Sequence, residues 1–234
     1  MTGTLDGLTR HLFDAPPGAD PLADEVSAWL AGSARFRAFA ERHRDKIRKK
    51  LRGATNLDAR RDVRAELRVA HLLLGDRRFE LAFEAYGSAT GGPDFTITYR
   101  GTTRFNLEVT RPRRAQDEAG LAATIAVKLR QLPPSIANVL LVATGGTDAA
   151  AVDVAGAVAS LRARVDAKDE AFFTTRGFAG SRGFHERLRR LGAVLAWCEA
   201  ANADARAVLW SNDSARIAVP DRARRACLAC LRAG

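Results

Sequence analysis

Hydrophobic positions along the chain change from a helical period to a strand period and back, which predicts an α/β protein. Between Val63 and Leu74 the apolar residues recur every three or four positions, as on one buried face of a helix. Between Phe79 and Phe83 they alternate with other residues, as on one side of a strand. Together these segments predict a helix that leads directly into a sheet.

Two further strands form a compact pair over residues 91–99 and 103–110, joined by the three residues 100–102. Antiparallel pairing across such a turn sets Asp94 directly opposite Glu108, and a two-residue turn would shift the register by only one. Directly opposed side chains have Cβ atoms roughly 5 Å apart. The pattern therefore predicts two carboxylates that face one another across a hairpin.

The rest of the chain is expected to complete a mixed central sheet flanked by helices. A helix follows the hairpin from about Leu121 to Leu132, and a buried strand is expected over residues 137–144. Thr147 or Asp148 is expected to cap a further helix. The later segments are predicted to be a glycine-rich loop and two strands, over residues 172–183, 193–198 and 205–212.

The N-terminal part is predicted to be helical and separate from the sheet. Its expected elements are a loose lead-in and two helices, over residues 1–20, 21–31 and 34–52. Asn56 or Thr55 is expected to cap the helix that follows. We therefore expect a basic helical extension over residues 1–54 and a main α/β domain over residues 55–234.

Asp94 and Glu108 bring chemistry into this picture. Like charges at that spacing repel each other, so a pair of acids on a sheet needs a cation, a shared proton or generous solvent. A hard, oxygen-seeking ion such as Mg²⁺ is the commonest functional answer. The hairpin therefore predicts a divalent-metal site.

The residues around this pair resemble a known family. Pro93-Asp94, a spacer of thirteen residues and Glu108-Val109-Thr110 resemble the Pro-Asp, spacer, Glu-x-Lys signature of the PD-(D/E)xK superfamily of restriction-endonuclease-like nucleases. The resemblance covers about residues 57–144, in the order helix, strand, strand with Asp, strand with Glu, helix, strand. It implies a restriction-endonuclease-like αβββαβ core within the main domain.

This resemblance implies a metal-dependent nuclease that hydrolyses phosphodiester bonds in DNA with metal-activated water. Asp94, Glu108 and the Val109 carbonyl would hold one or two Mg²⁺ or Mn²⁺ ions. Glu66, on the preceding helix, would be a further metal ligand, direct or through water. The alternative for Glu66 is an ordinary ion pair with a neighbouring arginine of its own helix.

Thr110 stands where the family has its lysine, whose charge is thought to position and activate the attacking water. Lys128 is a candidate replacement, because it shares a helical stripe with Leu121 and Ile125, and some members of the superfamily supply the lysine from that helix. Gln131 resembles the glutamine that accompanies it in several branches. The alternative for Lys128 is a side chain that only extends to the helix edge. The alternative for the whole protein is a nucleic-acid-binding module or structural subunit that has lost catalysis.

Charge favours a nucleic-acid partner. The 234 residues carry a formal net charge of +10, and basic residues concentrate between Arg35 and Arg68. Such a surface would bind a phosphate backbone in a salt-sensitive, largely sequence-independent manner; the alternative is a solvated face without a ligand. The residues expected to contact nucleic acid lie in this run and after the second acid, and they are Lys49, Lys50, Arg52, Arg111, Arg113 and Arg114.

Other features narrow the setting. Three cysteines cannot form a closed disulfide framework and favour a reducing compartment. Cys227 and Cys230 are expected to pack in a C-terminal helix rather than to bind zinc. The sequence shows no secretory signal or membrane span, which predicts a cytoplasmic protein. The resemblance leaves a homodimer open, because relatives that cut both strands are commonly dimeric.

Overall fold

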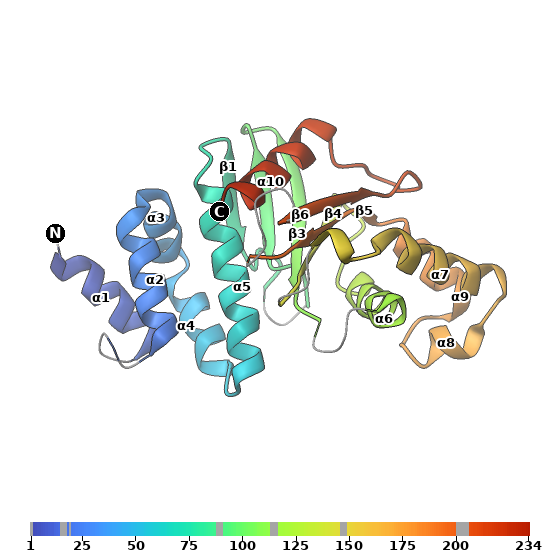
Figure 1. Cartoon of the computed structure of the whole chain (residues 1–234), viewed down its shortest axis with the longest axis horizontal. Coiled ribbons are helices and arrows are strands. Elements are labelled where there is room, and N and C mark those ends of the chain that lie inside the picture. The colour runs from blue at the N-terminus through green and yellow to red at the C-terminus, as the bar shows by residue number, and fades with distance from the viewer. Residues whose placement is uncertain are drawn as a thin grey trace.

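The computed structural model describes residues 2–14, 18, 20–87, 91–112, 117–145, 149–199 and 206–234. Within them, helices cover both faces of one mixed sheet (Figure 1). The strands are β1 (Phe79–Phe83), β2 (Phe95–Tyr99), β3 (Thr103–Thr110), β4 (Ala137–Ala143), β5 (Leu191–Trp197) and β6 (Ala207–Ser211). The α-helices are α1 (Thr2–Phe13), α2 (Pro21–Gly32), α3 (Ala34–Arg42), α4 (Arg44–Gly53), α5 (Leu57–Leu74), α6 (Glu118–Leu129), α7 (Val154–Asp166), α8 (Glu170–Thr174), α9 (Gly180–Leu188) and α10 (Asp221–Ala233), and a 3₁₀ turn, η1, spans Ala149–Ala151.

The order of strands in the sheet follows the chain, from β1 to β6, in the described residues. β1, β2 and β3 form an antiparallel meander, β3, β4 and β5 run parallel, and β6 returns antiparallel to β5. Parallel neighbours need a crossover connection, which α6 supplies between β3 and β4 and α7 to α9 supply between β4 and β5. The predicted mixed sheet flanked by helices is confirmed.

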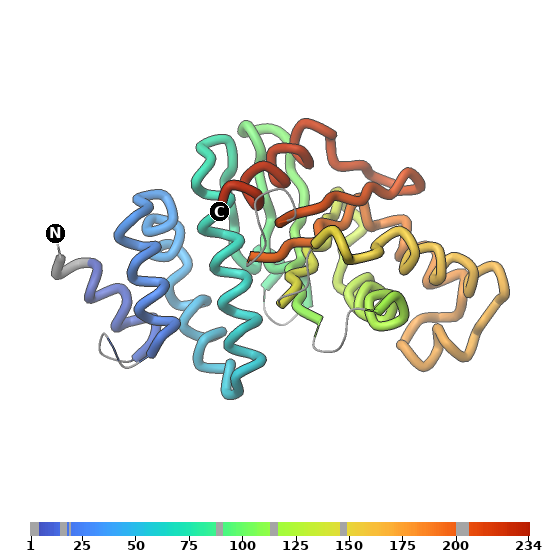
Figure 2. Tube along the Cα trace, in the orientation of Figure 1, coloured from blue at the N-terminus to red at the C-terminus, as the bar shows by residue number. Residues whose placement is uncertain are grey.

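Two hydrophobic layers hold the helices on the sheet. α5 and α10 cover one face, and α6, α7 and α9 cover the other, as the trace in Figure 2 shows. β4 is buried along its whole length because its side chains alternate between these layers. Val139 and Leu141 join the layer beneath α5, whereas Leu140 and Val142 join the layer beneath α6.

The elements around the hairpin occur in the predicted order, α5, β1, β2, β3, α6 and β4. Asn56 caps α5 as expected, because its side chain accepts the backbone N–H of Ala59 at 2.8 Å. The other predicted caps, Thr147 and Asp148, lie outside the described residues. The side chain of Asp153 caps α7 instead.

The N-terminal helices pack against α5. The predicted loose lead-in is wrong, because Leu5, Leu8 and Leu12 recur at helical spacing and α1 packs them against the neighbouring helices. The expected helix over residues 34–52 is two helices that meet at His43, whose backbone leaves helical geometry. Residues of α1 to α4 belong to the same hydrophobic cluster as α5 and the adjacent strands. The division at residue 54 stays a prediction.

The glycine-rich segment over residues 172–183 is not the predicted loop. It contains most of α8 and the start of α9. Three phenylalanines explain the difference: the ring centroids of Phe173 and Phe184 lie 4.6 Å apart, and those of Phe178 and Phe184 lie 5.1 Å apart. Glycine disfavours helix formation, and the burial of these aromatic rings supplies packing energy that offsets this cost.

The three cysteines are free, and Cys227 is buried in α10, in agreement with the expected packing role. Among the helices that the structure describes, none combines the length and apolar character needed to cross a membrane.

Candidate functional site

The hairpin register brings Asp94 and Glu108 together as predicted. Tyr99 pairs with Thr103 and Phe95 pairs with Leu107, so Asp94 and Glu108 are the next opposed positions. The backbone N–H of Asp94 donates to Glu108 Oε2 at 3.3 Å. The Val109 N–H donates to Asp94 Oδ2 at 2.9 Å. The two carboxylates are therefore fixed both by strand pairing and by hydrogen bonds to each other's strand.

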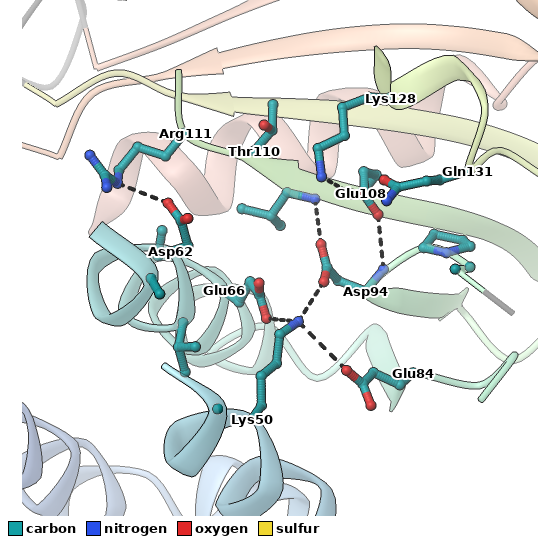
Figure 3. A pocket seen from close by; sticks show the side chains of 18 of the residues that line it. Lys50, Asp62, Glu66, Glu84, Asp94, Glu108, Thr110, Arg111, Lys128 and Gln131 are labelled. Carbon is teal, nitrogen blue, oxygen red and sulfur yellow. Dashed lines mark hydrogen bonds and ion pairs between the residues drawn. The ribbon is translucent and has the colours of Figure 1, made fainter. Parts of the chain in front are cut away.

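Lys50 lies at the centre of three carboxylates that come from different elements (Figure 3). Its Nζ lies 2.5 Å from Glu66 Oε2 on α5 and 2.8 Å from Asp94 Oδ1 before β2. Glu84 Oε1, in the turn after β1, lies 3.6 Å from the same nitrogen. Among the described residues, Glu66 therefore pairs with Lys50 of α4 and not with Arg64 or Arg68 of its own helix, which was the alternative that the sequence left open.

Lys128 completes the cluster from the opposite side. Its Nζ lies 2.6 Å from Glu108 Oε1, so α6 places this lysine where the sequence predicted it. Thr110 and Gln131 line the same cavity, and Figure 3 shows Gln131 beside Glu108. In the described part of the chain, Gln131 Oε1 is buried without a hydrogen-bond partner. The arrangement brings together the five predicted catalytic residues.

The cavity around these side chains has a volume of about 780 Å³. Its walls come from α4, α5, α6, β3 and the segment before β2. Glu66 and Glu108 are only 6% and 3% exposed, so they lie at its floor rather than in open solvent.

Burial makes the cluster an unfavourable place for carboxylates without counter-charge. Burial raises the pKa of Glu66 well above its usual range, and the charge of Asp94 adds to the rise. Burial and then Asp94 raise the pKa of Glu108 to about 7, although Lys128 opposes the rise. Burial lowers the pKa of Lys50, but Glu66 and Asp94 more than offset this, and the pKa is raised overall. The cluster therefore attracts positive charge.

Glu108→Gln is expected to stabilise the protein in EDTA increasingly as the pH rises. The unfolded carboxyl releases its proton near its ordinary pKa of 4.5, whereas the folded one keeps it to about pH 7, so wild-type stability falls across this window. The free energy of unfolding should shift in favour of the variant by about 3 kcal/mol between about pH 4 and about pH 8. Urea titrations at several pH values measure this.

The control for that experiment is Glu80→Gln, which makes the same change at an exposed position of β1. Its free energy of unfolding is expected to stay within about 0.5 kcal/mol of wild type, as is usual for a surface substitution. A pH-independent difference for Glu108→Gln would contradict the raised pKa.

Several residues expected to bind nucleic acid have internal partners. Arg111, whose side chain is 15% exposed, pairs with Asp58 at 3.0 Å and with Asp62 at 3.1 Å. Arg52 Nε lies 2.6 Å from Asp14. Lys49 lines the cavity beside Lys50, whose ammonium group faces the carboxylates. Arg113 and Arg114 lie outside the described residues.

Several arginines of the basic run between Arg35 and Arg68 likewise pair with acids within the fold. Arg64 bridges Glu25 and Glu199 at 2.5 and 2.7 Å, and Arg68 shares Glu199 at 2.8 Å. Glu25 and Glu199 are distant from these arginines in sequence, so the net charge of the run exceeds the positive charge that it leaves free in the folded protein. Arg48 and Arg60 have similar partners, Asp14 and Asp20.

The position of Lys50 and the contact of Glu84 with it do not follow from the sequence pattern. One signal for Lys50 was present: it lies one helical turn after Ile47, which is fully buried. Glu84 adopts a positive φ of 43° in the turn after β1, which turns it out of the strand alternation. Neither placement follows from local periodicity alone.

The donor set suits a hard cation in chemistry, because it consists of carboxylate oxygens in a cavity that Val109 also lines. As the side chains stand, the described residues contain no group of three or more His, Cys, Asp or Glu side chains arranged to hold a metal ion. Lys50 instead neutralises the carboxylates. Comparisons with family models, curated proteins and solved structures find no match for this chain.

Proposed function

We propose that this protein is a metal-dependent nuclease that hydrolyses phosphodiester bonds, with DNA as the first substrate to test. One observation carries the proposal: three buried carboxylates lie at one cavity in contact with two lysines. The carboxylates are Asp94, Glu108 and Glu66, and the lysines are Lys50 and Lys128. Buried acids with raised pKa values are costly, and such clusters concentrate at functional sites. The resemblance to PD-(D/E)xK nucleases supports the same activity.

Asp94, Glu108 and the Val109 carbonyl would hold Mg²⁺ or Mn²⁺, with Glu66 assisting. A bound ion of this kind supplies Lewis-acid charge and lowers the pKa of a coordinated water. The Val109 N–H fixes one Asp94 oxygen and leaves the other directed toward Lys50. Lys128 Nζ contacts Glu108, and this lysine would orient that carboxylate and supply positive charge for the negative charge that develops on a phosphate.

The test is cleavage of supercoiled plasmid and of labelled single-stranded and double-stranded DNA and RNA oligonucleotides. Each substrate is incubated with Mg²⁺, Mn²⁺ or EDTA, beside the double variant Asp94→Ala/Glu108→Ala. Cutting that requires a divalent ion and is absent from the variant supports the proposal. Equal inactivity of both proteins on every substrate would overturn it.

A second candidate is a nucleic-acid-binding module or structural subunit without catalysis. The placement of Lys50 favours this alternative, because an ammonium group already neutralises Glu66 and Asp94. Salt-sensitive binding without metal-dependent turnover in the same assay would select it.

Lys128→Met is expected to lower metal-dependent turnover about 100-fold, since it removes one preorganised positive charge from the reacting centre. Binding of the oligonucleotide in EDTA should change little. Single-turnover cleavage and fluorescence anisotropy measure the two quantities separately. Lys168→Met, which makes the same change in the exposed turn before α8, is the matched control. Undiminished cleavage by Lys128→Met would leave this lysine a structural role only.

A further inference from the structure

A second cavity adjoins the carboxylate cavity. It has a volume of about 790 Å³ and lies between the end of α6 and the segment from the α8–α9 connection into α9. Gly91, Val127 and Gln131 line both cavities, so the two form one continuous depression. We call its second half the α6–α9 groove; its other lining residues are Arg130, Gly177, Phe178, Ala179, Gly183, Glu186 and Arg187.

Two arginines of this groove donate to backbone carbonyls, unlike Arg64 and Arg68 of the N-terminal run, which pair with acids. Arg130 Nη1 donates to the Arg176 carbonyl at 3.4 Å, and Arg187 Nη1 donates to the Arg130 carbonyl at 3.1 Å. Within the part of the chain that the structure describes, neither forms an ion pair with a carboxylate, although Glu186 also lines the groove. A guanidinium has five N–H donors, so these carbonyls use only part of each group.

The wall shared by the two cavities carries an apolar side chain and an amide side chain. Val127 is 53% exposed, which is unusual for a large apolar side chain of this fold. Gln131 lines both cavities as well, so its amide side chain belongs to the same wall. From the carboxylates outward, the depression therefore presents a cation-attracting floor, an apolar and amide wall, and two guanidinium groups.

We infer that the α6–α9 groove binds the sugar–phosphate backbone of a polynucleotide strand that extends from the carboxylate cluster, with Arg130 and Arg187 as its phosphate contacts. This assigns the charged binding surface to α6 and α9 rather than to the basic N-terminal helices. A polynucleotide strand suits this order of contacts along the depression. Its phosphate charges repeat along the chain, with sugars and base faces between them. The direction toward Asp94 and Glu108 rests on the proposed function.

The test measures binding of a fluorescent single-stranded oligonucleotide in EDTA over a series of salt concentrations. Arg130→Gln/Arg187→Gln should bind about 10-fold more weakly near 0.1 M salt, and its slope of log affinity against log salt should fall by about 1.4, or about 0.7 for each lost phosphate contact. Arg222→Gln/Arg225→Gln removes the same charge from exposed positions of α10 and should bind like wild type. Arg130→Lys/Arg187→Lys keeps the charge and should retain the wild-type slope of log affinity against log salt. Because it changes the same two positions, it shows whether weaker binding of the glutamine variant comes from lost charge or from a folding defect.

Equal binding by the groove variant and the α10 variant would overturn the inference, as would wild-type protein that binds anionic lipid vesicles but no oligonucleotide. The cleavage assay separates this result from the proposed function. Weakened binding of the groove variant together with an inactive wild type would retain the groove and reject the nuclease. Metal-dependent cleavage by wild type together with unchanged binding of the groove variant would retain the nuclease and reject the groove.

Discussion

Asp94→Asn is expected to lower metal-dependent cleavage about 1,000-fold, which corresponds to about 4 kcal/mol of transition-state stabilisation. Asparagine keeps an oxygen that can accept the Val109 N–H, so the hairpin geometry should survive. What it removes is the negative charge that faces Lys50 and would bind a cation. Initial rates of oligonucleotide cleavage across a Mn²⁺ titration measure the effect.

Glu80→Gln is the matched control, because it makes the same carboxylate-to-amide change on the exposed side of β1. It should cut at nearly the wild-type rate. Full activity of Asp94→Asn at saturating metal would show that the reaction does not depend on this carboxylate and would reject the proposed site.

Lys50→Met is expected to lower the free energy of unfolding by about 3 kcal/mol in EDTA. Removing one partner of a buried ion pair costs about 3–5 kcal/mol because the remaining charge is left uncompensated, and we take the lower end because the Lys50 side chain is 24% exposed. Urea titrations at neutral pH measure the loss. The cost should shrink as the pH falls, since protonation of Glu66 and Glu108 removes the unneutralised charge.

Lys46→Met provides the comparison within the same helix. Lys46 Nζ donates to the carbonyls of Phe83 and Glu84 at 3.0 and 2.9 Å and forms no ion pair with the buried cluster among the described residues. Its replacement should cost about 1 kcal/mol. Mn²⁺ should restore more stability to Lys50→Met than to Lys46→Met, because a bound cation replaces the lost charge. The same metal-induced gain in both variants would mean that the carboxylates do not bind the ion.

The hairpin was predictable because its information is local. The side-chain alternation and the three-residue turn fix the register of β2 and β3, and the register alone sets Asp94 opposite Glu108. Lys128 was predictable for a similar reason, since helical spacing selects one face of α6. The sheet class followed from the order of apolar segments.

Contacts between distant segments were not predictable in this way. Lys50 reaches Asp94 across 44 positions, and Arg64 reaches Glu199 across 135. A run of basic residues therefore looked like a free surface until the fold supplied its acids. The segment over residues 172–183 was misjudged for the same reason, because its phenylalanines gain their packing energy only in the folded protein.

The position of Lys50 on α4 has a consequence for how this protein can be divided. A cut or fusion in the short connection between α4 and α5 separates the three acids from the lysine that neutralises them. A gene fusion, a recombination or a designed chimaera that carries only the hairpin and its two flanking helices would therefore lack Lys50. The smallest transferable unit that keeps the site intact therefore includes α4 and the helices that hold it in place.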